Sequence, residues 1–190
     1  MTEIKRVTKE TDIKLELNLY GSGKSDINTQ IGFFDHMLES FSKHSLIDIS
    51  LECKGDIHVD FHHSVEDVGI VIGEALKKEI FPISDIERFG EASVVMDEAC
   101  VNCVLDLSNR AYLYFELPIS GKVGDFDVEL CEEFFKSLIL NAGISAHIVY
   151  QRGENKHHII EATFKSFALA LRRAVSKNHK IGIPSTKGVL

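Results

Sequence analysis

Apolar and polar residues alternate at matching places in the two halves of the chain, and this alternation predicts strands. In the first half, Leu15, Leu17 and Leu19 alternate with polar residues up to a glycine-containing turn. Further strand-like stretches, typical of half-buried strands, cover residues 46–53, 101–107 and 144–150, and the apolar run at 94–96 opens the second half. Each half therefore begins with strands and gains another strand further along.

Helical patterns separate these strands in the same order in both halves. Two stretches in each half have helical periodicity: residues 36–41, 73–78, 133–138 and 168–173. The last helix of each half ends in a basic turn, which suits the negative end of the helix dipole. We predict an α+β fold with a duplicated strand-strand-helix-strand-helix unit and helices packed between two outer sheets. The halves, 1–85 and 86–190, would form one compact unit.

The composition narrows the class of protein. The chain has 190 residues, of which 44% are hydrophobic and 26% charged, so it can bury a full core. The formal net charge of −8 argues against a nucleic-acid partner. The N-terminus lacks the apolar core of a signal peptide, and no run approaches the roughly 18 apolar residues of a membrane span. We therefore expect a cytoplasmic protein without a membrane partner.

A histidine pair followed by a carboxylate occurs once in each half, at the start of a helical pattern. The two clusters are His62, His63 and Glu66, and His157, His158 and Glu161. Residues four apart share a helix face, so His62 and Glu66 can hold one ion, as can His157 and Glu161. The intervening histidines point about 100° away and can serve a different ion. The alternative is a helix start with solvated imidazoles, but two matching clusters favour binding of Mn, Fe or Zn.

Other motifs support weaker hypotheses. His36 follows Asp35 and is either a ligand beside a supporting carboxylate or a satisfied core residue; its counterpart in the repeat is Glu133. Residues 21–25 imitate the end of a phosphate-binding P-loop. The full motif requires glycine at position 18, where this chain has Asn18, so a hairpin turn fits better. Cys100 and Cys103 have the spacing of zinc ligands but lie in a strand pattern, which favours buried thiols.

Basic residues and the C-terminal segment offer a second kind of candidate site. Arg88, Arg110 and Lys165 are ordinary surface residues by default. The segment 184–188 combines hydroxyls, Lys187 and a glycine, which is what a phosphate-binding loop needs. From the residues alone, Glu10 would have no claim to a role.

Several long motifs together resemble one known family, the imidazoleglycerol-phosphate dehydratases of histidine biosynthesis. The motifs are FDHML at 34–38, DFHHSVED at 60–67, MDEA at 96–99, GENKHHIIEA at 153–162 and IPSTKG at 183–188. The resemblance runs from Glu10 to Gly188. It implies a fold like that of domain 2 of ribosomal protein S5. It also implies the removal of water from D-erythro-imidazole-glycerol phosphate to give imidazole-acetol phosphate.

The resemblance further implies two Mn²⁺ ions per active site, built where subunits meet in a homo-oligomer of twenty-four chains. One ion would take His36, His63, His157 and Glu161. The other would take His62, Glu66, His158 and the residue at position 133. Some members of the family have histidine directly before the Phe-Phe pair, whereas this chain has Glu133, itself a competent Mn²⁺ ligand.

The same resemblance assigns the substrate contacts and the catalytic set. Glu10 matches the family's substrate-contacting acid, and the catalytic set would be Glu10, His63 and Glu161. Arg88 and Arg110 match arginines on the phosphate side. The remaining substrate-binding residues would be Ser185, Thr186 and Lys187 in the C-terminal loop, His44 and Lys165, and the metal ligands His36, His62, His63, Glu66, His157, His158 and Glu161.

The implied chemistry explains why metals would be needed. Hydroxide must leave C3 of the glycerol chain, and a proton must leave C2, which is not acidic. Loss of the imidazole N–H proton would let the ring expel the hydroxyl, and a carboxylate such as Glu10 would move protons. Two other functions use similar residues: a two-metal phosphoester hydrolase and a non-catalytic metal-storing shell.

Overall fold

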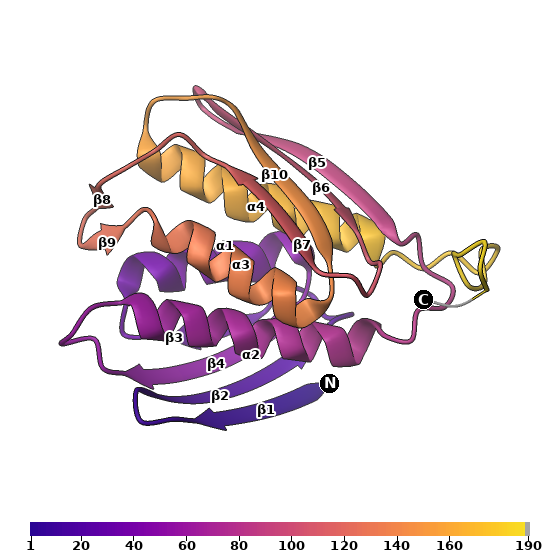
Figure 1. The fold of residues 1–190 in the computed structure, drawn as a ribbon, viewed down its shortest axis with the longest axis horizontal. Helices are drawn as coiled ribbons and strands as arrows, with labels where there is room; N and C mark the ends of the chain where they lie inside the picture. The colour runs from indigo at the N-terminus through magenta and orange to yellow at the C-terminus, as the bar shows by residue number, and fades with distance from the viewer. Residues whose placement is uncertain (189–190) are drawn as a thin grey trace.

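The computed structural model describes residues 1–188, and Figure 1 shows two halves built in the same way. The first half contains β1 (Thr2–Val7), β2 (Thr11–Asn18), β3 (Ser25–Asn28), α1 (Gly32–Ser45), β4 (Asp48–Gly55) and α2 (His62–Ile80). The second contains β5 (Phe89–Met96), β6 (Ala99–Asp106), β7 (Tyr112–Glu116), β8 (Lys122–Val123), β9 (Phe126–Asp127), α3 (Leu130–Ala142), β10 (Ser145–Arg152) and α4 (Lys156–Ala174).

The two four-stranded sheets have the same topology, which confirms the predicted duplication. Their strand orders are β1-β2-β4-β3 and β5-β6-β10-β7. In each sheet the first three strands in this order pair antiparallel, and the last, edge strand pairs parallel to its neighbour. The edge strands β3 and β7 extend the predicted unit, so each four-stranded sheet takes three of its strands from the segment before the first helix of its half. The small β8–β9 hairpin has no counterpart in the first half.

Each sheet buries one face. In β2, Ile13, Leu15 and Leu17 have no exposed surface, and Leu15 lies opposite Leu51 of β4. The alternate positions of these strands, such as Lys14 and its partner across the sheet, stay in solvent. This is the arrangement that the period-two pattern predicts, because successive side chains point to opposite faces of a strand.

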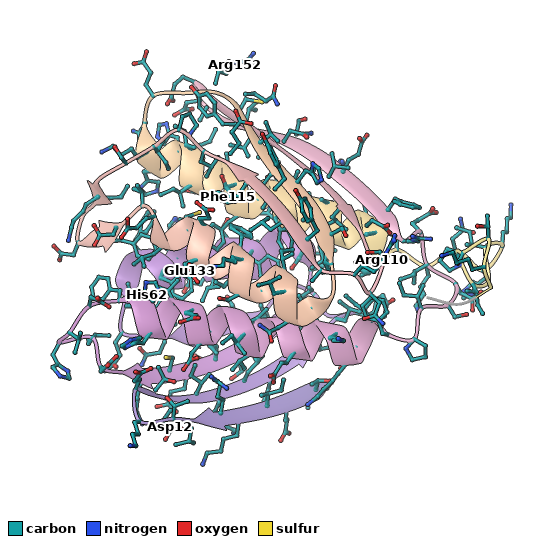
Figure 2. All side chains as sticks on the ribbon, viewed as in Figure 1. Asp12, His62, Arg110, Phe115, Glu133 and Arg152 are labelled. Carbon is teal, nitrogen blue, oxygen red and sulfur yellow. The ribbon has the colours of Figure 1, made fainter. Side chains whose placement is uncertain are left out.

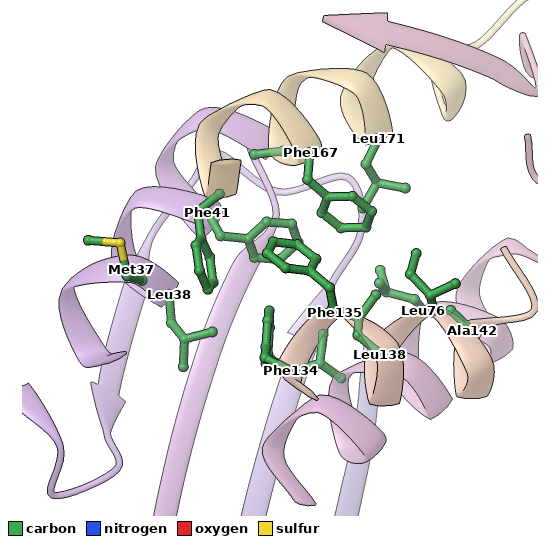
Figure 3. Packing of buried hydrophobic residues seen from close by; sticks show 14 of the residues in the cluster. Met37, Leu38, Phe41, Leu76, Phe134, Phe135, Leu138, Ala142, Phe167 and Leu171 are labelled. Carbon is green, nitrogen blue, oxygen red and sulfur yellow. The ribbon is translucent and has the colours of Figure 1, made fainter. Parts of the chain in front are cut away.

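The four helices lie between the sheets, as predicted (Figure 1). α2 packs on α3 and α1 packs on α4, so each helix of the first half contacts one of the second. Figure 3 shows the interior between them, where Phe41 of α1 contacts Phe167 of α4. Phe34 of α1 likewise contacts Phe134 of α3. Full burial of a side chain of this size contributes about 1.5–3 kcal/mol. One core therefore joins the two halves.

The boundary between the halves falls in the segment that connects α2 to β5. Ile83 and Ile86 of this segment are buried, and Ile86 pairs with Lys177 near the C-terminus. The division into 1–85 and 86–190 stays a prediction, and residues 189–190 lie outside the described residues. Within residues 1–188, no helix is both long and apolar enough to span a membrane.

α2 of the first half and α3 of the second approach each other closely at two glycines of α2. A Cβ atom built on Gly73 would lie 2.5 Å from the carbonyl oxygen of Leu138 and 2.8 Å from the Cβ of Asn141. A Cβ atom on Gly69 would lie 2.8 Å from the carbonyl oxygen of Phe134. These backbone atoms have little room to move, so the glycines set the distance between the two helices.

This contact predicts that Gly73→Ala destabilises the protein although alanine is the better helix former. We expect the free energy of unfolding to fall by about 1–3 kcal/mol, the usual cost of overpacking, against a gain of about 1 kcal/mol from helix propensity. Urea unfolding at fixed protein concentration measures the difference. Gly32→Ala is the control, because nothing lies within 4 Å of a Cβ atom there. A stabilised Gly73→Ala variant would show that the helices are free to separate.

Candidate active site

The two histidine pairs lie at the first turns of α2 and α4, and both turns are fixed in the same way. The side chain of Asp60 accepts a hydrogen bond from the backbone N–H of His62 at 2.8 Å. Asn155 accepts from the N–H of His157 at 2.9 Å. Such contacts satisfy N–H groups that lack partners within the helix. Each pair is thereby held at the positive end of a helix dipole.

Three of the predicted ligands of one ion come together at the α1–α4 contact. The Nε2 atom of His157 lies 3.2 Å from a carboxylate oxygen of Glu161, and that of His36 lies 3.5 Å from the same oxygen. One ligand atom from each residue lies within 4.8 Å of the others. Two imidazole nitrogens and a carboxylate suit Mn²⁺, Fe²⁺ or Zn²⁺, so these residues could hold a metal. The edge of Phe33 covers the His157 ring.

Glu161 stays ionised in this setting. Its side chain is only 9% exposed. Burial raises the pKa of its carboxyl, but the hydrogen bond and the charge of Lys165, at 2.7 Å, outweigh that effect and leave the pKa below its ordinary value. An ionised carboxylate is the form that binds a cation. Lys165 therefore fixes the second oxygen of Glu161 and leaves the first oxygen to the two histidines.

His44 of α1 lies near Lys165 and Arg172 of α4. Burial and the charges of Lys165 and Arg172 lower the pKa of its imidazole. Arg172 also donates a hydrogen bond to the backbone carbonyl of His44. The predicted substrate residues His44 and Lys165 thus lie together, next to Glu161. His44 is neutral at neutral pH.

His63 and Glu10 form a second group, away from the three-residue cluster. The Nε2 atom of His63 lies 3.7 Å from a carboxylate oxygen of Glu10, which sits in the β1–β2 turn. Its Nδ1 atom lies 3.0 Å from a carboxylate oxygen of Asp56, and that hydrogen bond raises the His63 pKa. The structure brings Glu10 and His63 together, but it does not place His63 with His36 in one chain.

The predicted ligands of the other ion are only partly assembled. His62 and Glu66 lie one helical turn apart, with 3.9 Å between Nε2 and the carboxylate. His158 pairs with Glu98 at 2.8 Å, and Glu133 pairs with Lys136 at 3.5 Å. In a single chain, the four therefore do not form one cluster.

The predicted phosphate residues line one open pocket of about 750 Å³. Arg88, Arg110, Ser185, Thr186 and Lys187 all belong to its wall, together with Phe89, Ser108 and Asn109. Hydroxyls, a lysine and arginines are groups that bind phosphate. The charged side chains of this pocket come from three places: Arg88 lies directly before β5, Arg110 lies in the loop after β6, and Lys187 lies in the C-terminal segment.

Arg88 has a structural task within this pocket. Its guanidinium pairs with Asp106 at 2.7 Å and 3.0 Å, and it donates to the backbone carbonyl of Pro184 at 2.6 Å. These contacts tie the C-terminal segment to β6. Among the predicted phosphate residues, Arg110 and Lys187 make no side-chain ion pair within residues 1–188.

The predicted metal ligands and the pocket with the predicted phosphate-binding residues lie at opposite ends of the folded molecule. Figure 2 labels His62 at one end of the helical layer and Arg110 at the other, near the C-terminal segment. His157 belongs to the same end as His62, since α2 and α4 begin there (Figure 1). A small substrate cannot reach both ends of one chain.

Sequence reasoning missed two carboxylates and misplaced a third. Asp56 contacts His63 across the loop between β4 and α2, and Glu98 contacts His158 from 60 residues away, and neither contact follows from a helical or strand spacing. Asp35 was considered as the supporting carboxylate of His36; instead, it accepts hydrogen bonds from the backbone and hydroxyl of Thr29 at 2.8 Å and 2.5 Å and fixes the start of α1. The predicted burial of Cys100 and Cys103 is confirmed.

The fold and the clustered histidines and carboxylates are those of a duplicated α+β enzyme with a candidate cation site. The chain belongs to the imidazoleglycerol-phosphate dehydratase family, whose model matches residues 29–171. A curated relative of that name from Aliarcobacter butzleri is 67% identical over 190 residues, which is 100% of both chains. The one from Campylobacter hominis is 65% identical over 185 residues, covering 97% of each chain.

Solved structures agree with this assignment. The crystal structure of imidazoleglycerol-phosphate dehydratase from Staphylococcus aureus is 40% identical, with a TM-score of 0.83, and covers 93% of this chain and 98% of that one. The enzyme from Pyrococcus furiosus, solved in complex with (S)-C348, is 37% identical with a TM-score of 0.85 and covers 98% and 100%. The predicted fold class and family are therefore confirmed.

The lowered pKa of His44 predicts a pH-dependent stability. Between the folded pKa and the ordinary value near 6.5, the unfolded chain binds more protons at this position, so His44 lowers the free energy of unfolding as pH falls through that window. His44→Gln should remove this contribution. Urea unfolding of the wild type and of His44→Gln at pH 7.5 and pH 5.5 measures this contribution. Lys165→Met should weaken the effect, since one source of positive charge is gone. A pH-independent difference between wild type and His44→Gln would contradict the assignment.

Proposed function

We propose that the chain removes water from D-erythro-imidazole-glycerol phosphate to give imidazole-acetol phosphate, a step of histidine biosynthesis in the cytoplasm. The observation that carries the proposal is the coexistence of two sites in a chain of this family. One is the His36, His157 and Glu161 cluster, which can hold a cation. The other is the pocket with Arg110 and Lys187, which suits a phosphate.

The cofactor would be Mn²⁺, with two ions per active site. When bound, Mn²⁺ is a Lewis acid that favours loss of the N–H proton from an imidazole ring. His36, His63, His157 and Glu161 would hold one ion, and His62, Glu66, His158 and Glu133 the other. The buried, ionised carboxylate of Glu161 supports the first set most directly.

The protein's own groups would do the remaining work. Arg110, Ser185, Thr186 and Lys187 would bind the phosphate and fix the position of the glycerol chain. Arg88 would support them by tying the C-terminal segment to β6. Glu10 would move a proton at C2 or C3, and its place 3.7 Å from His63 puts an acid–base group beside a proposed ligand. His44 and Lys165 would contact the substrate beside Glu161.

The active site would form between subunits of a homo-oligomer, which we infer to contain twenty-four chains. One chain holds its cation cluster and its phosphate pocket at opposite ends, so a complete site would need at least two chains. The outer face of the second sheet also exposes large apolar residues, as an interface would: Phe89, Val95, Val104, Tyr112 and Tyr114 are 43–66% exposed.

A single assay tests the proposed reaction. The metal-stripped and Mn²⁺-loaded proteins would be incubated with imidazole-glycerol phosphate, and the enolisable ketone and free phosphate would be measured. We expect ketone without free phosphate, and only from the loaded protein. Free phosphate would indicate a phosphoester hydrolase, and neither product would indicate metal storage.

Variants should separate phosphate binding from proton transfer. Lys187→Ala and Arg110→Ala would remove charge-assisted bonds to a phosphate far from the reacting carbons, so they should mainly raise KM, by the equivalent of about 1.5–3 kcal/mol each. Glu10→Gln keeps the shape but cannot take up or release the proton, so kcat should fall by roughly 100-fold or more. Steady-state kinetics with Mn²⁺ in excess gives both constants. An unchanged kcat for Glu10→Gln would exclude it as the acid–base group.

Metal removal should also reduce the size of the assembly. If ions take ligands from more than one chain, their binding energy contributes to association. Light scattering should detect smaller particles after chelation and the original size after Mn²⁺ is restored. An unchanged size in protein verified to be metal-free would show that the interfaces do not depend on metal.

A variant of Glu133 tests the proposed ligand at which this chain differs from some family members, which have histidine there. Glu133→Ala should weaken Mn²⁺ binding and give activity that added metal partly restores. Glu132→Ala is the matched control, because it removes an exposed neighbouring carboxylate. If Glu133→Ala keeps its full metal content and activity, the second ion takes another donor. The first alternative to examine is His147 of β10, which lies on the outer sheet face beside Tyr112 and Tyr114.

A further inference from the structure

The second histidine of each pair has a carboxylate at its Nδ1 atom. Asp56 lies 3.0 Å from Nδ1 of His63, and Glu98 lies 2.8 Å from Nδ1 of His158. An ionised carboxylate only accepts hydrogen bonds, so it favours the ring form with the proton on Nδ1. That form keeps the lone pair of Nε2 available. Both rings are therefore prepared to bind a cation through Nε2.

The two contacts are not a by-product of the duplication. Asp56 follows Gly55 at the end of β4, in the same half as His63. The residue in the corresponding place after β10 is Glu154, which follows Gly153 and is exposed. His158 takes its partner instead from Glu98, in the β5–β6 turn. The two halves thus reach the same geometry with residues from different elements.

Both carboxylates are themselves fixed. The backbone N–H of Asp56 donates to the carbonyl of Glu10 at 3.0 Å. The other oxygen of Glu98 accepts from the N–H groups of Asn155 and Glu154 at 2.8 Å and 3.2 Å. The carboxylate of Glu98 is therefore held from a second side, and Asp56 is anchored through its backbone, so the rings that they contact lose little freedom when an ion binds.

We propose that Asp56 and Glu98 are positioning residues for metal binding, which orient His63 and His158 so that Nε2 faces the ion. The inference rests on the proposed function, because the ions concerned are those that His63 and His158 would help to hold. It assigns no direct contact with metal or substrate to either carboxylate.

The test is a Mn²⁺ titration of the metal-stripped full chain, without substrate, in which electron paramagnetic resonance reports free Mn²⁺. Asp56→Ala and Glu98→Ala should each weaken the affected site by roughly 10- to 100-fold. Asp56→Asn and Glu98→Gln retain an oxygen that can accept from Nδ1, and each should recover part of the loss. Glu154→Ala removes an exposed carboxylate from the β10–α4 loop, at the place that corresponds to Asp56, and should leave binding unchanged.

A double-mutant cycle distinguishes orientation from a general structural role. In a chain that already carries His158→Ala, Glu98→Ala should cause no further loss of Mn²⁺ affinity, and Asp56→Ala should likewise add nothing to His63→Ala. Unchanged affinity in the single variants, or an equal loss in both backgrounds, would overturn the inference. Those outcomes leave the proposed function standing if the wild type binds Mn²⁺. A wild type that binds none would overturn the proposed metal and this inference together.

Discussion

The structure depends on one constraint: each sheet has a single apolar face, and both faces must be covered by the same layer of helices. The helices therefore lie between the sheets and contact one another across the halves, α1 with α4 and α2 with α3. Gly69 and Gly73 allow the second of these contacts to be close, because no side chain intervenes. The first contact brings His36 of α1 beside His157 and Glu161 of α4. Packing thus creates the cation cluster.

The same packing explains why the two candidate sites, for a cation and for a phosphate, lie apart in one chain. α2 and α4 both begin at one end of the layer, so both histidine pairs lie there, at positive helix ends. The strand ends with Arg88 and Arg110, and the C-terminal segment with Lys187, lie at the other end (Figure 2). If one substrate uses both sites, as we propose, a single chain cannot form a complete active site. Assembly would then join the cation cluster of one chain to the phosphate pocket of another.

Much of this could be predicted from the sequence, because the informative patterns are local. The alternation around Leu15 and the periodicity after His62 and His157 gave the sheets, the helices and the duplication. The i,i+4 spacing placed His157 with Glu161. Short, exposed β3 has no such pattern, since only Ile27 among its four residues is apolar. Contacts between distant residues, such as that of His158 with Glu98, depend on the fold and have no signal in the local sequence.

The central claim is that a complete active site takes its two ends from different chains, and mixing two variants that are each impaired at one end tests it most directly. One variant would carry His157→Ala at the cation end, and the other Lys187→Ala together with Arg110→Ala at the phosphate end. The two would be stripped of metal, mixed and reassembled with Mn²⁺. If sites form between chains, the mixture regains dehydratase activity, because some sites combine the intact ends of both variants. Activity equal to the mean of the two separate variants would contradict the account.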